Sequence, residues 1–321
     1  MSQIRVGVVR GGPSSEYAVS LKTGENVLHH LNKQKYIPID ILLTTRGEWY
    51  INGVHTDLAT IAQQIDVAWN ALHGTFGEDG KVQQQFESFG IPYTGSGILA
   101  SAMGMHKGLA KERFSDAGLL TPQGIVIEEN DNFQEIAAQV FHKQRLPLIV
   151  KPISGGSSVA TNIVRTGEEF TYALEAASKF GDILVEEVIE GTEATCCVVE
   201  TSSRDEHVVL YPIEIVPPDA TSFFDYDAKY GGASKEICPG RFTFGTHQKL
   251  RELASKAHRA IGARHYSRSD FIVSKNGIYI LETNTLPGLT KESLLPKALA
   301  AGGVAMPDFL DHIISLTLSG N

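Results

Sequence analysis

Strand and helix patterns alternate through the first hundred residues, and this alternation limits the possible fold more than any other feature. Apolar runs at residues 4–9, 37–43 and 65–72 are typical of buried strands, and residues 19–31 have the spacing of a helix. Strands joined through helices usually lie parallel in one sheet, with the helices packed on its faces. The sequence therefore predicts an α/β subdomain built on a small parallel sheet.

The rest of the chain mixes strands and helices in the α+β manner. Apolar runs predict strands at residues 146–150, 183–185, 194–199, 208–215, 271–273 and 278–281, and helices at 105–117, 248–261 and 309–318. Residues 217–241 are rich in Gly, Pro, Asp and Tyr, and their aromatic side chains favour an ordered lid. A chain of 321 residues suggests several subdomains, which we place at residues 1–98, 99–185 and 186–321.

Composition disfavours several classes of function. A net charge of −9 argues against a nucleic-acid partner, because clustered Lys and Arg hold phosphate backbones. No apolar run is long enough to span a bilayer and no signal peptide is visible, so we expect a cytoplasmic protein without a membrane partner. Three cysteines cannot form a disulfide framework. In a strand the neighbours Cys196 and Cys197 would point to opposite faces, as small buried packing residues.

The strongest candidate for chemistry is a polar hairpin near the C-terminus. Period-two geometry puts Arg268 and Asp270 on one face of its first strand, and Glu282 and Asn284 on one face of its second. The length of the turn decides whether the two faces coincide. A two-residue turn over residues 276–277 would turn Glu282 away from Asp270.

A three-residue turn over residues 275–277, with its glycine left-handed, sets Asp270 opposite Glu282 and the two outer residues opposite each other. We predict this second turn. Two carboxylates held side by side repel each other unless a cation lies between them or one is protonated. Oxygen ligands of this kind suit Mg²⁺, with phosphate oxygens completing its shell. The alternative is that these acidic residues are solvated at strand ends.

Other segments give weaker signals. Lys151 leads into the Gly-Ser run at residues 154–158, whose N–H groups and hydroxyls suit a polyphosphate, although a flexible loop is an equal alternative. It is not a Walker A loop, and the glycine pair at residues 11–12 lacks the spacing of a dinucleotide site. The chain leaves the hairpin at Gly288 and enters a helix at Ser293, where exposed N–H groups would suit a carboxylate or an oxyanion.

Taken in order, these motifs resemble the D-alanine–D-alanine ligases of the ATP-grasp superfamily. The resemblance extends over essentially the whole chain, through residues 11–16, 73–80, 93–97, 151–159, 186–193, 226–230 and 268–294. It implies an ATP-grasp fold, in which two α+β subdomains clamp ATP beside the α/β subdomain. It also implies the ATP-dependent joining of two D-alanine molecules through an acyl phosphate, with ADP and phosphate released, for peptidoglycan precursor synthesis.

The resemblance assigns roles to residues. The catalytic set would be Glu16, Ser157, Tyr230, Arg268 and Gly288. The amino-acid substrates would bind Glu16, His73, Lys229, Ser293 and Leu294. The nucleotide would bind Lys107, Lys151, Gly156, Ser157, Ser158, Glu186, Glu187, Ile189 and Glu193. Two Mg²⁺ ions, for which Mn²⁺ could substitute, would bind Asp270, Glu282 and Asn284. The family also implies a homodimer.

Two residues could have a purely structural role instead of the role that the family implies. Glu16 could serve only to match the dipole of the helix it precedes, and His73 could be a satisfied loop histidine. Three positions depart from the family's pattern. His106 stands where Asp is usual, Tyr17 where Arg is usual, and Ala160 where Gly is usual.

Rival functions remain at this stage. A sibling ligase could join D-alanine to D-lactate or D-serine, although Tyr230 resembles the dipeptide-forming enzymes. Another ATP-grasp carboxylate–amine ligase would share the nucleotide and metal residues. A regulatory protein on a decayed ligase scaffold would be expected to have lost Arg268 or a metal carboxylate, and both are present.

Overall fold

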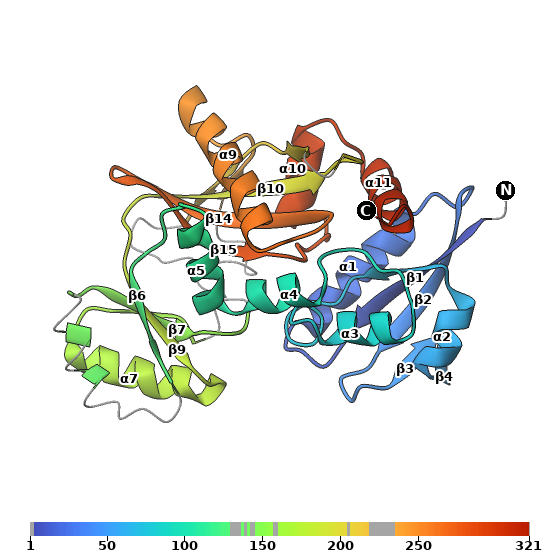
Figure 1. The fold of residues 1–321 in the computed structure, drawn as a ribbon, viewed down its shortest axis with the longest axis horizontal. Helices are drawn as coiled ribbons and strands as arrows, with labels where there is room; N and C mark the ends of the chain where they lie inside the picture. Colours follow the sequence, from blue (N-terminus) through green and yellow to red (C-terminus); the bar gives the residue numbers. More distant parts are fainter. Residues whose placement is uncertain are drawn as a thin grey trace.

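The computed structural model describes residues 3–128, 136–137, 140–141, 145–156, 160–203, 206–217 and 235–320. In these ranges the chain forms three sheets with helices packed on them (Figure 1). No helix within the described ranges is both long and apolar enough to cross a membrane.

The N-terminal sheet has the order β4-β3-β2-β1-β5. Its strands are β1 (Ile4–Gly11), β2 (Tyr36–Leu43), β3 (Trp49–Ile51), β4 (Val54–Thr56) and β5 (Val67–Asn70). Its helices are α1 (Tyr17–His30), α2 (Leu58–Gln64) and α3 (Lys81–Ser88). β1 pairs in parallel with β2 and with β5, which confirms the predicted parallel sheet. The antiparallel edge strands β3 and β4 were not predicted from the sequence.

The central sheet is antiparallel and has the order β6-β9-β7-β8. Its strands are β6 (Gly124–Ile127), β7 (Leu148–Pro152), β8 (Asn162–Val164) and β9 (Ile183–Glu187). Helix α7 (Gly167–Ala177), with the 3₁₀ turn η1 (Ser178–Phe180), packs on it. Helices α4 (Ile98–Met105) and α5 (Lys107–Asp116) link it to the N-terminal sheet (Figure 1). The subdomain ranges stay a prediction, and the boundary after residue 185 falls inside β9.

The largest sheet has the order β13-β12-β10-β14-β15, with β11 also paired to β10. Its strands are β10 (Thr192–Glu200), β11 (His207–Val209), β12 (Ile213–Val216), β13 (Lys235–Ile237), β14 (Tyr266–Ser274) and β15 (Gly277–Asn284). The helices of this part are α9 (Phe244–Ala260), α10 (Leu294–Ala301) and α11 (Met306–Leu318). The single strand predicted at residues 208–215 is wrong. Pro212, which has no N–H to donate, lies between β11 and β12.

Each face of the largest sheet is buried in a different core. The adjacent cysteines demonstrate this arrangement, because Cys196 packs in the core under α9 and Cys197 in the core under α10 and α11. Both thiols are fully buried, as predicted. The core that contains Cys197 also contains residues of the N-terminal sheet. The first and last parts of the chain therefore share one hydrophobic core, which fixes the position of the N-terminal sheet.

Candidate active site

A buried ion-pair network joins the central sheet to helix α5. Glu186 of β9 is fully buried and pairs with Lys151 of β7 and with Lys111 of α5, whose Nζ lies 2.7 Å from Oε2. Lys111 also donates to the hydroxyl of Thr121 at 2.8 Å and to the carbonyl of Pro122 at 3.2 Å. Burial raises the pKa of Glu186, but the two lysine charges outweigh it and lower the pKa overall. The network holds Lys151 and Glu186 in fixed positions.

Lys151 and Glu186 lie on the wall of a cavity of about 880 Å³ between the central and the largest sheet. All described residues that were predicted to bind the nucleotide line this cavity: Lys107, Lys151, Gly156, Glu186, Glu187, Ile189 and Glu193. Ser157 and Ser158 lie outside the described residues. The ammonium of Lys107 donates to the carbonyl of Gly155 at 2.7 Å, so it lies beside the glycine-rich segment. The predicted nucleotide residues are thus gathered around one space, and their contact with a nucleotide stays a prediction.

The polar hairpin has the predicted pairing. In the ladder of β14 and β15, Asp270 lies opposite Glu282 and Arg268 lies opposite Asn284. All four residues line a second cavity of about 520 Å³. The prediction that they meet on one face is therefore confirmed.

The route to this pairing differs from the prediction. Ser274 pairs with Gly277, so the turn has two residues, 275–276, and the predicted three-residue turn is wrong. The register shifts by one residue next to Phe271, which leaves Leu281 as the extra residue on β15. A β-bulge of this kind inserts one residue into one strand only. The bulge, not the turn, brings the two carboxylates together.

Arg268 holds Asp270 through a bidentate ion pair. Nε lies 2.9 Å from Oδ1 and Nη2 lies 2.8 Å from Oδ2, while the hydroxyl of Thr195 donates to Oδ1 at 2.5 Å. Burial lowers the pKa of Arg268, but the charge of Asp270 and the hydrogen bonds outweigh it, so the pKa is raised. The guanidinium is therefore charged at every accessible pH and is fixed at the cavity wall.

The second cavity also collects the described residues that were predicted for the amino acids, namely Glu16, His73, Ser293 and Leu294, together with Gly288 of the predicted catalytic set. A Cβ at Gly288 would lie 2.9 Å from the Ser293 hydroxyl oxygen, so a side chain at this position would displace that hydroxyl. Helix α10 starts at Leu294 directly after Ser293, which confirms the predicted helix start. Lys229 and Tyr230, with most of the predicted lid at 217–241, lie outside the described residues.

Glu16 reaches from the N-terminal subdomain to the glycine-rich segment. It precedes α1 but makes no capping hydrogen bond with its side chain. Its carboxylate lies so close to two loops that a Cβ at Gly74 would be 2.9 Å from Oε2, and a Cβ at Gly156 would be 3.4 Å from Oε1. Glu16 lines both cavities. Its side chain is therefore turned to the cavities and not to the N-terminus of its own helix.

His73 lines the second cavity with both ring nitrogens already bonded inside the protein. Nδ1 lies 3.2 Å from Oε1 of Glu78, and Nε2 lies 2.9 Å from the hydroxyl of Thr23. Burial raises the pKa of Glu78. These contacts agree with the alternative of a satisfied loop histidine, and its contact with substrate stays a prediction.

The two cavities meet at the polar hairpin. Asp270, Glu282, Glu16, Lys107, Gly156 and Glu193 line both of them. Asp270, Glu282 and Asn284 offer hard oxygen atoms at this junction, which is the donor set that Mg²⁺ prefers. Arg268 forms its ion pair with Asp270, and its charge also acts on Glu282, so two carboxylates share one guanidinium at this junction. The residues present therefore fit a magnesium site.

The structure shows the consequence of two of the three departures from the family pattern. His106 caps α5, because its Nδ1 accepts the N–H of Leu109 at 3.1 Å, as an Asp side chain would. Ala160 has a φ of 53°, a left-handed conformation that favours glycine. Nothing in the structure explains Tyr17 at the start of α1.

Sequence reasoning missed Lys111 and Thr195. Lys111 lies four residues after Lys107, which is one helical turn, so a helical reading could have placed both ammonium groups on one face. Thr195 lies opposite Asp270 on the neighbouring strand β10. That pairing is non-local and leaves no signal in the sequence near either residue.

Comparison with known proteins supports this picture. The family model described as D-ala D-ala ligase C-terminus matches residues 114–315, and the model described as D-ala D-ala ligase N-terminus matches residues 5–63 and 52–96. The D-alanine–D-alanine ligase of Syntrophobacter fumaroxidans is 41% identical over 323 residues, which cover 98% of each chain.

Solved structures of the same group superpose along the whole chain. The D-alanine–D-alanine ligase of Bacillus anthracis complexed with ATP is 33% identical, with a TM-score of 0.81 and coverage of 99% of this chain and 98% of that one. The VanG D-Ala:D-Ser ligase of Enterococcus faecalis is 30% identical, with a TM-score of 0.86 and coverage of 98% and 100%. The predicted ATP-grasp fold is confirmed. The chain belongs to the D-alanine–D-alanine ligase family.

Proposed function

We propose that this enzyme joins two D-alanine molecules at the expense of ATP, giving D-alanyl-D-alanine, ADP and phosphate. One observation carries the proposal: a cavity lined by the nucleotide residues and a cavity lined by the amino-acid residues meet at Asp270 and Glu282. A γ-phosphoryl group at that junction would lie beside a carboxylate bound in the second cavity. Transfer between the two is the first half of an acyl-phosphate mechanism.

Within this mechanism the basic residues neutralise phosphate charge. Lys151 and Lys107 would contact the phosphates, with Gly156, Ser157 and Ser158 donating from the glycine-rich segment. Glu186, Glu187 and Ile189 would meet the adenine, and Glu193 the ribose. Asp270, Glu282 and Asn284 would hold Mg²⁺, which supplies further charge neutralisation during phosphoryl transfer. This division of labour agrees with the residues that line each cavity.

On the amino-acid side, Glu16 would hold the ammonium of the first D-alanine, with His73 nearby. Arg268 and the N–H of Gly288 would stabilise the oxyanion that forms when the second amine attacks the acyl phosphate. Ser293 and the N–H of Leu294, at the start of α10, would receive the carboxylate of the second D-alanine. Ser157 and Tyr230 would bond with Glu16 as the segment at residues 217–241, which carries Lys229, closes over the site and excludes water.

The second candidate joins D-alanine to D-serine, because the VanG D-Ala:D-Ser ligase is 30% identical and superposes along the whole chain. Both reactions would use the same nucleotide and metal residues. They would differ only at the second amino-acid site. In either case the product would serve peptidoglycan precursor synthesis in the cytoplasm. The homodimer also remains part of this proposal.

Phosphate release from ATP tests the proposal. D-alanine, L-alanine, D-serine and D-lactate are each supplied alone, and in parallel the last three are each mixed with D-alanine. We expect D-alanine alone to stimulate release, with D-alanyl-D-alanine as the product identified by mass. Faster release with the D-alanine and D-serine mixture, and a mixed dipeptide as main product, would favour the second candidate. No stimulation by any of the D-amino acids would contradict both.

A further inference from the structure

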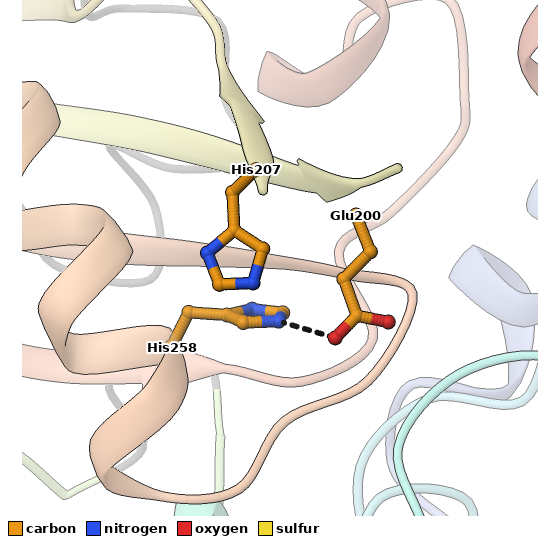
Figure 2. Close-up of side chains that lie close together, drawn as sticks. All are labelled: Glu200, His207 and His258. Atoms are coloured by element: carbon orange, nitrogen blue, oxygen red, sulfur yellow. Dashed lines mark hydrogen bonds and ion pairs between the residues drawn. The ribbon is translucent and has the colours of Figure 1, made fainter. Parts of the chain in front are cut away.

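A cluster of two histidines and a glutamate lies in the largest sheet, where strands β10 and β11 meet helix α9. Glu200 is the last residue of β10, His207 is the first residue of β11, and His258 lies in the last turn of α9 (Figure 2). One ligand atom from each residue lies within 4.8 Å of the other two. None of the three is among the described residues that line either cavity. The cluster is therefore distinct from the active site.

The backbone fixes the cluster. Glu200 and His207 lie directly opposite each other in the antiparallel ladder of β10 and β11. Helix α9 packs against both strands and brings His258 to them, with its side chain 1% exposed. Figure 2 shows the His207 ring above the His258 ring, and their centroids are 5.0 Å apart. The three side chains thus converge from three elements that strand pairing and helix packing hold together.

Neighbouring serines orient both imidazole rings. Nδ1 of His258 lies 2.7 Å from the hydroxyl of Ser267, and Nδ1 of His207 lies 3.1 Å from the hydroxyl of Ser255. Nε2 of His258 faces Oε1 of Glu200. A bond from the second ring nitrogen to an oxygen atom fixes the tautomer and the ring orientation of metal-binding histidines. The two serines occupy that position for both rings.

We propose that Glu200, His207 and His258 bind a divalent transition-metal ion of the Zn²⁺ type. Two imidazole nitrogens and one carboxylate oxygen are ligands that Zn²⁺ prefers, with water in the fourth position. Ligands about 2.05 Å from a tetrahedral ion lie about 3.3 Å apart. The Nε2 atom of His258 is 3.4 Å from Oε1 of Glu200, which matches this separation. The same distance is longer than the ~2.7–2.9 Å of a strong charge-assisted hydrogen bond.

The remaining contacts prepare the carboxylate. Oε2 of Glu200 accepts the backbone N–H of His265 at 2.6 Å, which leaves Oε1 on the side of the histidines. Burial raises the pKa of Glu200, but the bonds from His258 and from the N–H of His265 outweigh it and lower the pKa. Only small side-chain shifts, of about 1.5 Å or less, would bring all three ligands to tetrahedral separation.

Zinc binding by the full-length enzyme tests the site. The protein is freed of metal with EDTA and kept in excess Mg²⁺, so that the acidic hairpin of the active site is occupied. Zn²⁺ is then titrated against a chromophoric chelator for wild type, His207→Asn, Ser255→Ala and His55→Asn. His207 is chosen because the more buried His258 is a riskier position to replace, and His55 is an exposed histidine on β4.

We expect one tight Zn²⁺ ion per chain in wild type and in His55→Asn. The affinity should fall at least about tenfold in His207→Asn, and by about 10–100-fold in Ser255→Ala, which removes an outer-shell partner. Co²⁺ should give the visible absorption bands of a tetrahedral site in wild type and not in His207→Asn. Wild type that binds Zn²⁺ no more tightly than His207→Asn would overturn the proposal. So would a Zn²⁺ site that is lost in Glu282→Gln and kept in His207→Asn, because the metal would then belong to the active site.

Discussion

Ala160 is one of four described residues other than glycine whose φ is positive. It follows the glycine-rich segment and has a φ of 53°. A left-handed conformation costs a residue with a Cβ roughly 1–2 kcal/mol, and glycine avoids that cost. Glycine in turn loses more entropy on folding, roughly 0.5–1 kcal/mol relative to alanine. The balance favours glycine, which agrees with the family's usual residue at this position.

Replacement of Ala160 by glycine should therefore stabilise the enzyme by about 0.5–1 kcal/mol. The midpoint of urea unfolding measures this change. The matched control is Ala59→Gly in helix α2, where the backbone is helical and glycine should destabilise by about 1 kcal/mol. If both variants lose stability by the same amount, the strain assigned to Ala160 is not present.

At the scale of elements, the β-bulge on β15 decides what faces the active site. Ile280 is buried in the core under α9, and in a regular strand Glu282 would point to the same side. The extra residue Leu281 breaks that alternation, so Leu281 and Glu282 both line the cavity. Bulges often redirect side chains beside active sites. The hairpin can thus bury an apolar face and still present a carboxylate.

Helix α5 depends on His106 for its N-terminus. The ring Nδ1 accepts the N–H of Leu109, one of the helix donors that have no partner within the helix. His106→Ala should cost about 1 kcal/mol of unfolding free energy, whereas His106→Asp should retain the cap and cost little. Chemical denaturation of both variants distinguishes the two cases. Equal destabilisation in both variants would mean that the ring acts through packing and not through its nitrogen.

Several features could be predicted from the sequence, because their signals are local. The parallel strands β1, β2 and β5 are apolar runs, and the polar hairpin shows polar residues at every second position of each strand. The edge hairpin of β3 and β4 was missed because each strand has three residues, although Asn52-Gly53 is a strong turn signal. The contact of Thr195 with Asp270 could not be predicted, since the two residues lie on strands far apart in the chain. The bulge at Leu281 could not be predicted either, because the apolar run of β15 does not show which residue is the extra one.

At the scale of the whole molecule, three aromatic rings join the two ends of the chain. Trp69 of β5 stacks on Tyr266 of β14 at 6.4 Å between centroids, and Phe309 of α11 lies edge-on to both. All three are almost completely buried. The N-terminal subdomain carries Glu16, and the largest sheet carries Arg268. The aromatic cluster therefore fixes the two sides of the second cavity relative to each other.

Phe309→Ala should destabilise the enzyme by about 3–5 kcal/mol, because it leaves a cavity at the centre of the shared core. The thermal unfolding midpoint reports the loss. Phe244, an exposed residue at the start of α9, provides the control, and Phe244→Ala should change stability by less than about 0.5 kcal/mol. A midpoint in Phe309→Ala equal to that of the control would show that the two ends are held together elsewhere.

We propose that phosphoryl transfer occurs where the two cavities meet, on the carboxylates of the polar hairpin. The most direct test of this proposal is the rate of D-alanine-dependent phosphate release in Glu282→Gln, which removes one charge and nearly preserves shape. The reference is Glu112→Gln on the exposed side of α5. We expect phosphate release to fall at least about 100-fold in Glu282→Gln, with ATP still bound, and to keep its normal rate in Glu112→Gln. Near-normal turnover by Glu282→Gln would contradict the proposal.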